Sequence, residues 1–137
     1  METLASAYKG RRVLVTGDTG FKGSWLSWWL TRLGATVSGF ALPPEHPAGP
    51  FSAAELRRVI RHRDGDVRDV AAVSSALRSG KPEIIFHLAA QPLVRLSYKD
   101  PLGTLATNVM GTANLLDAAR RTPSVRAIVV VTSDKCY

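Results

Sequence analysis

The chain has 137 residues, 45% of them hydrophobic and 21% charged, which is ordinary for one globular domain. Its formal net charge of +7 fits either nucleic acid or phosphorylated small molecules, but the arginines are dispersed without interleaved aromatic residues, so we expect no nucleic-acid partner. The single cysteine excludes an internal disulfide framework, and short apolar runs with no signal peptide indicate a cytoplasmic protein without a membrane anchor.

The first predicted strand, residues 12–16, runs into a glycine-rich turn and then into a predicted helix. Gly17, Gly20 and Gly23 are spaced three apart. A strand, glycine turn and helix in this order aim helix amides and the positive end of the dipole at a phosphate. We therefore predict nucleotide binding, with Gly17 permitting the turn, Gly20 admitting the phosphates and Gly23 allowing close packing. A turn without a ligand is the alternative.

The first helix, predicted over 21–33, is more apolar than one buried face requires. Three leucines share one face, and an aromatic set occupies the next: Phe21, Trp25, Trp28 and Trp29. We expect a helix packed on more than one side, with its tryptophans in the core or at an interface. A second strand is predicted over 35–42, and a proline-rich surface loop over 43–50.

The middle of the chain predicts shorter elements. Ser52 and Glu55 have the spacing of a capping box, which predicts a short helical segment from Ser52. A third strand is predicted over 59–63. Asp69 is expected to cap a helix over 70–79, with three residues of that helix facing inward: Val70, Val73 and Leu77.

The last third predicts strand, helix and strand. A strand is predicted over 83–88, and a loop precedes a long helix from 101 to about 121. Pro101 suits the first helical position because its missing N–H is not needed there. Four residues recur on this helix at helical spacing: Leu105, Val109, Ala113 and Leu116. A final apolar strand is predicted over 127–132.

Five strands alternating with helices predict an α/β fold. Continuous apolar strands indicate a parallel sheet covered on both faces, and right-handed crossovers favour the doubly wound order 3-2-1-4-5. We therefore predict one Rossmann-type dinucleotide-binding domain over residues 1–137, in which the fifth predicted strand lies close to the last residue of the sequence. Ligands should bind at the carboxyl ends of the strands, where the order reverses.

Residues after the second and third strands bear on the cofactor. No acid follows the second strand until Glu45, and no arginine stands there for a 2′-phosphate, so these residues leave NAD and NADP open. Asp66 and Val67 follow the third strand, where they would meet an adenine edge. Asp66 as a simple turn residue is the alternative.

The fourth and fifth strands end in residues that suit a ligand. Small side chains after the fourth strand would let the backbone approach it, in the run Leu88, Ala89, Ala90 and Gln91. After the fifth strand come Ser133, Asp134 and Lys135, the chemically richest site in the chain, although Ser-Asp could instead cap a following helix. His87 is interpreted as a core histidine, and no metal site is predicted because the histidines lack ligand spacing.

Several ordered segments resemble the extended short-chain dehydrogenase/reductase superfamily: 16–23, 65–69, 87–98, 107–112 and 131–137. Within it, Phe21-Lys22-Gly23, the run 91–98 and Ser133 to Tyr137 resemble the CDP-glucose 4,6-dehydratases. Asp18 departs from the pattern, because that family more often has histidine there.

The resemblance implies tightly held NAD and CDP-glucose as the substrate. Hydride would leave C4 of the glucose, water would be lost across C5–C6, and hydride would return to C6 to give a 4-keto-6-deoxy sugar. Ser133 would then hydrogen-bond the C4 oxygen, Asp134 would protonate the departing C6 hydroxyl, and Lys135 would take the C5 proton.

The resemblance also assigns binding residues and an assembly. Gln91, Arg95 and Ser133 would lie near the sugar nucleotide, Asn108 would order the site backbone, and the complete protein would be a homo-oligomer. The implied cofactor set is Gly17, Thr19, Gly20, Phe21, Lys22, Asp66, Val67, Leu88, Ala89, Ala90, Gln91 and Asn108.

One motif of the superfamily has no counterpart in these residues. Its Tyr-x-x-x-Lys pair should follow Ser133 at some distance, and Tyr137 follows the last strand too closely to be that tyrosine. We expect the 137 residues alone to be inactive, and whether the chain continues past Tyr137 stays open. The alternatives are a non-catalytic NAD(P)-binding module or another extended short-chain dehydrogenase, such as a sugar-nucleotide epimerase.

Overall fold

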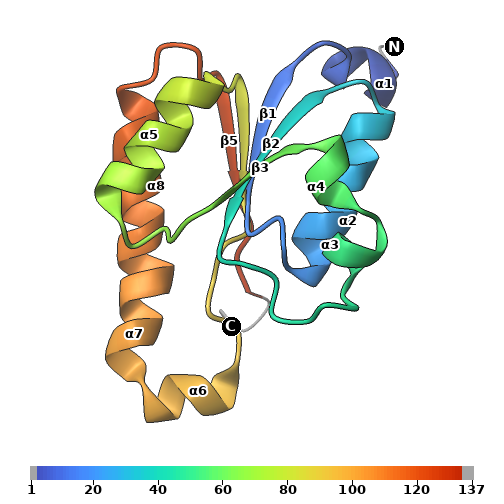
Figure 1. The fold of residues 1–137 in the computed structure, drawn as a ribbon. Helices are drawn as coiled ribbons and strands as arrows, with labels where there is room; N and C mark the ends of the chain where they lie inside the picture. The colour runs from blue at the N-terminus through green and yellow to red at the C-terminus, as the bar shows by residue number, and fades with distance from the viewer. Residues whose placement is uncertain (1–2, 134–137) are drawn as a thin grey trace.

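A sheet of five parallel strands forms the centre of the computed structural model, which describes residues 3–133 (Figure 1). The strands lie in the order β3-β2-β1-β4-β5, so the predicted topology is confirmed. Their bounds are β1 Arg12–Thr16, β2 Thr36–Ala41, β3 Arg61–Asp64, β4 Ile84–His87 and β5 Ala127–Val130.

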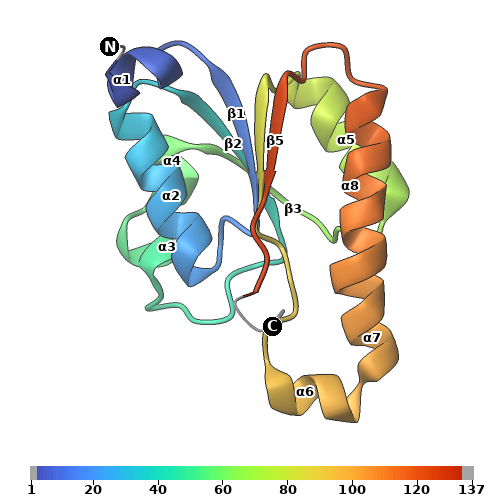
Figure 2. The ribbon, with the colours of Figure 1, turned by 180° about the vertical axis from the view of Figure 1, so that it is seen from behind.

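Helices cover both faces of the sheet, as Figures 1 and 2 show. One face carries α5 and α8, and the other carries α2, α3 and α4. Within residues 3–133, no helix is both long and apolar enough to cross a membrane. The helices are α1 Leu4–Tyr8, α2 Phe21–Arg32, α3 Pro50–Ala53, α4 Leu56–Val59, α5 Val70–Gly80, α6 Val94–Lys99, α7 Pro101–Leu105, the π-helix η1 Ala106–Met110 and α8 Gly111–Arg120.

The two faces have separate cores because successive side chains of a strand point to opposite sides. Leu14 and Ile85 pack with residues of α5 and α8 in one cluster. Val13 and Val15 pack with residues of α2, α3 and α4 in the other. Since β1 is buried on both sides, its sequence reads as a continuous apolar run.

The helix after β3 begins as predicted. Asp69 caps α5, and its Oδ1 accepts the amides of Ala71 and Ala72 at 2.9 and 3.0 Å. Val73 and Leu77 are buried as predicted, but Val70 is 49% exposed, so its inward position was wrong. The buried stripe of α5 begins one turn into the helix, after Val70.

The predicted capping box is wrong. The structure starts α3 at Pro50, with Gly49 as its N-cap, and Ser52 lies inside the helix. Proline has the φ that the first helical position needs, so the helix starts before Ser52. Glu55 takes a left-handed φ of 49° between α3 and α4. The third strand starts at Arg61 because Val59 still belongs to α4.

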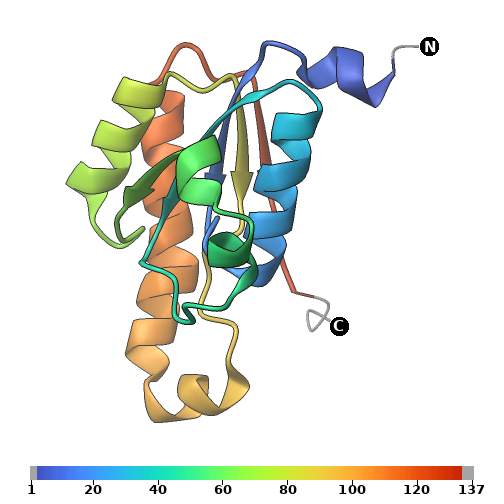
Figure 3. The same ribbon diagram turned by 45° about the vertical axis from the view of Figure 1, so that its right-hand side comes forward.

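The long helix predicted over 101–121 is present as α7, η1 and α8, but the residues singled out on it point outward. Leu105, Val109 and Leu116 are 55%, 55% and 42% exposed, whereas Leu115 is buried. In Figure 3, α7 extends past the carboxyl edge of the sheet, so the sheet does not cover it. The π-helix also changes the helical period, so one stripe cannot run along the whole segment.

The aromatic face of α2 is exposed within the described residues. Trp25, Trp28 and Trp29 are 56%, 41% and 50% exposed, so their predicted place in the core is wrong, and an interface stays a prediction. The helix instead meets the sheet with its smallest side chains and one leucine. A close approach through glycine and serine leaves the bulky rings on the outer side.

A chain of hydrogen bonds connects β1, β4 and the long helix. Thr16 Oγ1 lies 3.2 Å from the amides of both Leu88 and Ala89 and 2.6 Å from His87 Nδ1. With both lone pairs accepting, the Thr16 hydroxyl donates to His87 Nδ1. His87 Nε2 then donates to Thr112 Oγ1 at 3.0 Å. Burial lowers the pKa of His87, in keeping with this neutral form, and the interpretation as a core histidine is confirmed.

Thr16→Val should destabilise the fold by roughly 2–4 kcal/mol, because it leaves the Ala89 amide and a buried imidazole nitrogen without partners. The Leu88 amide keeps its hydrogen bond to the Thr16 carbonyl oxygen at 3.1 Å. Urea unfolding measures the loss. Thr31→Val makes the same exchange at a partly exposed position of α2 and should change stability by less than about 0.5 kcal/mol. Equal stability of Thr16→Val and the wild type would contradict this account of the network.

Candidate functional site

The glycine turn lies at the carboxyl edge of the sheet, at the point where the strand order reverses. β1 is flanked by β2 on one side and by β4 on the other, and the turn leaves β1 there for α2. Crossovers that diverge from a central strand leave a crevice at its carboxyl end, and ligands of doubly wound sheets bind in it. The fold therefore places the predicted nucleotide-binding turn at the expected site.

Two of the three glycines are required by the backbone. Gly17 has a φ of +74°, and a Cβ there would lie 2.8 Å from the amide nitrogen of Ala89. A Cβ on Gly23 would lie 2.0 Å from the carbonyl oxygen of Gly17. A Cβ on Gly20 would have one close neighbour, that same oxygen, at 3.3 Å. Gly20 thus leaves open space on the outer side of the turn.

The N-terminus of α2 can receive an anion. Gly20 is its N-cap and supplies no side-chain hydrogen bond, so no capping group competes for the first amides of the helix. The first turn contains no acidic residue, and Lys22 adds a positive charge. Free amides, the helix dipole and a cation fit a pyrophosphate group.

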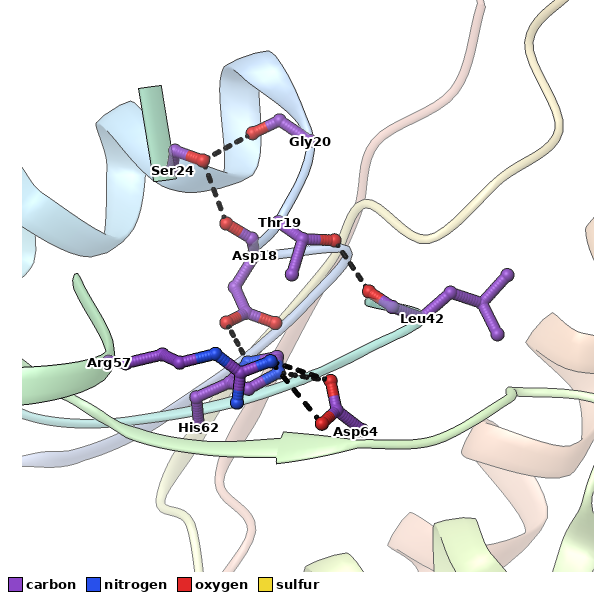
Figure 4. A network of polar contacts seen from close by, with 8 residues as sticks. All are labelled: Asp18, Thr19, Gly20, Ser24, Leu42, Arg57, His62 and Asp64. Carbon is purple, nitrogen blue, oxygen red and sulfur yellow. Dashed lines mark hydrogen bonds and ion pairs between the residues drawn. The ribbon is translucent and has the colours of Figure 1, made fainter. Parts of the chain in front are cut away.

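Hydroxyl groups hold the turn against its neighbours (Figure 4). Ser24 Oγ lies 2.9 Å from the carbonyl oxygen of Asp18 and 2.7 Å from that of Gly20. Thr19 Oγ1 donates to the carbonyl oxygen of Leu42 at 2.9 Å, which connects the turn to the end of β2. The Thr19 hydroxyl, predicted to meet the cofactor, is thus used within the protein.

A buried carboxylate extends from the turn to β3. Asp18 is 0% exposed, and its Oδ2 lies 2.6 Å from Nδ1 of His62, whose side chain is 1% exposed. Neither residue was given a role in the sequence analysis. Gly39 was the available signal, because glycine inside a strand marks a close approach. A Cβ there would lie 2.0 Å from Asp18 Oδ2.

His62 lies between two carboxylates. Its Nε2 is 3.0 Å from Asp64 Oδ1, so both ring nitrogens face acceptors and both must donate, as an imidazolium does. Burial opposes the charge, but the hydrogen bonds to Asp18 and Asp64 outweigh it and raise the pKa of His62 above 6.5. Hydrogen bonds from His62 and Arg57 lower the pKa of Asp64.

The residues predicted to meet an adenine edge are already engaged in the protein. Asp66 accepts from the Arg68 guanidinium at 2.6 Å and from the Arg68 amide at 2.9 Å, and this pairing lowers the pKa of Asp66. Asp66 therefore has the turn role that was the alternative. Val67 is 5% exposed, with its side chain against Gly111. Contact of either residue with adenine stays a prediction.

The loop after β4 is held at both of its ends. Thr16 accepts the amides of Leu88 and Ala89, as described above. Asn108, in η1, accepts the amide of Gln91 at 2.7 Å and donates to its carbonyl oxygen at 3.1 Å. The side chain of Gln91 is bonded within the protein, to Thr104 and to Leu93. Asn108 therefore orders this loop, because its side-chain amide donates to and accepts from the backbone of Gln91.

The predicted substrate residues are only partly described. Arg95 lies on α6, where it lines an open hollow together with Leu93, Val94, Leu96 and Lys99. Ser133 is exposed and follows β5 at the carboxyl edge of the sheet. Asp134 and Lys135 lie outside the described residues.

The chain is similar to solved epimerases. It superposes on an epimerase from Methanothermobacter thermautotrophicus with a TM-score of 0.78 at 28% identity, covering 95% of this chain and 37% of that one. The UDP-glucose 4-epimerase of Stenotrophomonas maltophila, solved with bound NAD and formylated UDP-arabinopyranose, gives 0.77 at 25% identity, covering 90% and 37%.

Sequence comparison leads to the same group. The chain is 49% identical over 130 residues to the CDP-glucose 4,6-dehydratase of Salmonella typhimurium, which is 95% of this chain and 36% of that enzyme. It thus spans little more than a third of this relative. The model of the GDP-mannose 4,6 dehydratase family matches residues 14–137. The chain belongs to the GDP-mannose 4,6-dehydratase family.

Proposed function

We propose that this chain is the dinucleotide-binding part of an NAD-dependent dehydratase that converts CDP-glucose to CDP-4-keto-6-deoxyglucose. The observation that carries the proposal is the glycine turn, which delivers an uncapped helix N-terminus to the reversal point of the sheet. The choice of CDP-glucose is supported by 49% identity to the Salmonella dehydratase.

The residues present fit NAD. The pyrophosphate would lie on the first amides of α2, over Gly20, and Leu88 to Ala90 would let the cofactor approach the end of β4. When bound, the nicotinamide supplies an acceptor for the C4 hydride and returns it to C6. The sequence left NAD and NADP open, and the proposal of NAD is supported by the NAD in the Stenotrophomonas epimerase structure.

The sugar chemistry is assigned to the residues after β5. Ser133 would hydrogen-bond the C4 oxygen, Asp134 would protonate the departing C6 hydroxyl, and Lys135 would remove the C5 proton. A lysine acts as a base only when neutral, and its ordinary pKa is about 10.4. A protonated Asp134, which its role as an acid requires, would remove the carboxylate that otherwise favours the charged amine.

Epimerisation at C4 is the second candidate, because both structural neighbours described above are epimerases. The two reactions share C4 oxidation and differ at C6, which keeps its oxygen in an epimerase. Mass analysis of the product from CDP-glucose distinguishes them, since the dehydratase product has lost one water.

Gly20→Val should weaken NAD⁺ binding by about 100-fold or more, equivalent to about 2.8 kcal/mol, because the side chain would occupy the space over the turn. Titration calorimetry measures the affinity, and circular dichroism checks the fold. Gly49→Val is a matched control, since Gly49 is also a helix N-cap and its Cβ would lie 3.2 Å from a carbonyl oxygen. Unchanged affinity in a folded Gly20→Val protein would remove the turn from the cofactor site.

Lys135→Ala, made in the enzyme that carries this chain, should keep C4 oxidation but slow proton exchange at C5 by about 10²- to 10⁴-fold. NADH absorbance reports the oxidation, and deuterium uptake from solvent reports the exchange. Lys9→Ala, on the exposed surface, should change neither. If Lys135→Ala exchanges the C5 proton at the wild-type rate, the lysine is not the base.

A further inference from the structure

The turn contains a buried charge with one compensating partner. Among residues 3–133, Asp18 is the only acidic residue in the buried set. A buried carboxylate is costly unless it is paired and hydrogen-bonded. His62 provides the pairing at Oδ2, while Oδ1 has no hydrogen-bond partner within the described part of the chain. The stability of the charge at this position therefore depends on His62.

We propose that the Asp18–His62 ion pair holds the glycine turn in its dinucleotide-binding conformation, so that His62 is a positioning residue for the cofactor. This inference rests on the proposed function. His62 lies on β3 and acts through Asp18, which lies between Gly17 and Gly20 in the turn. Figure 4 shows the Asp18 side chain directed away from α2 and toward His62.

The ion pair acts on the backbone of the turn through the short side chain of Asp18. The Asp18 carboxylate lies over Gly39, where the missing side chain gives it room, and the Asp18 carbonyl oxygen accepts from Ser24. If the carboxylate lost its partner it would move toward water to be solvated. Its backbone would move with it, and so would the neighbouring amides that define the phosphate cradle.

The groups around His62 give the direction of a pH effect. Asp18 faces it from the turn and Asp64 from its own strand, while Arg57 of α4 pairs with Asp64 at 3.0 Å. The ring of Phe51, from α3, packs against it with centroids 4.9 Å apart. The two carboxylates raise the pKa of His62, so the pair is complete below 6.5 and is lost as the pH rises through the raised value.

The ion pair is first tested without cofactor. Nitrogen NMR of the wild-type chain at pH 6 should show His62 protonated on both ring nitrogens, with the Gly17 and Gly20 amides protected from hydrogen exchange. These amides donate to Phe40 and Gly17 carbonyl oxygens at 3.0 and 3.1 Å. In His62→Gln the hydrogen-exchange rates of these two amides should rise by roughly 10- to 100-fold, while the amides of β4 keep their protection.

The consequence for the cofactor is tested by calorimetry with NAD⁺ between about pH 6 and 9, the range in which a histidine with a raised pKa loses its proton. Wild-type affinity should fall as the pH rises, and His62→Gln should bind roughly 10- to 100-fold more weakly at pH 6 with no such slope. His46→Gln, an exposed loop histidine, should keep the wild-type profile. Asp18→Asn should remove the slope as well.

The outcomes separate the inference from the proposed function. A wild-type affinity and pH slope in His62→Gln would overturn the positioning role. Unchanged hydrogen-exchange protection of the turn amides in His62→Gln would overturn it too. If His62→Gln proved less stable, the NMR signals of His62 in the wild-type chain would still test the ion pair. A wild-type chain that shows the NMR signature but does not bind NAD⁺ would overturn the cofactor assignment and with it the positioning role.

Discussion

The approach of α2 to the glycine turn is the constraint on which the rest of the structure depends. With 2.0 Å between a hypothetical Cβ of Gly23 and the Gly17 carbonyl oxygen, the helix and turn leave no room for a side chain. Because they are this close, the helix amides arrive directly at the carboxyl end of β1. The same closeness turns the bulky residues of α2 outward and places Asp18 against β3. A helix set farther away would have neither the anion cradle nor the buried carboxylate.

Two buried histidines show how partners decide charge. His87 faces the hydroxyls of Thr16 and Thr112, which can donate as well as accept, so burial prevails and its pKa falls. His62 faces two carboxylates, which only accept when ionised, so its pKa rises despite burial. The first histidine secures the loop after β4 and the second secures the loop after β1. The candidate site is therefore bounded by two imidazoles whose pKa values are shifted in opposite directions.

Much of the fold could be predicted because its signals are local. The apolar run of β1, the spacing of the glycines and the cap at Asp69 each act within a few residues, and all three are found in the structure. The predictions that failed depended on what lies across the sheet. Whether Trp28 or Val70 is covered is decided by neighbouring elements, and η1 changes the helical phase without an evident sequence mark.

The candidate site also has one part that could be predicted from local sequence and one part that could not. The glycine turn was readable because three residues of one type repeat at a fixed interval. The Asp18–His62 pair was not, because its members are 44 residues apart and meet only when β2 contributes a glycine between them. Glycine in a strand does signal a close approach, but it does not say which side chain approaches.

The tryptophans of α2 give this chain a built-in optical property. Trp25 and Trp28 stand edge to face with ring centroids 6.2 Å apart, and both are more than 40% exposed on a helix that begins at the glycine turn. Indole emission shifts with the polarity of its surroundings and overlaps the absorption of reduced nicotinamide. Light emitted by this helix should therefore respond to whatever covers its outer face and to the redox state of a dinucleotide beside it, without any added label.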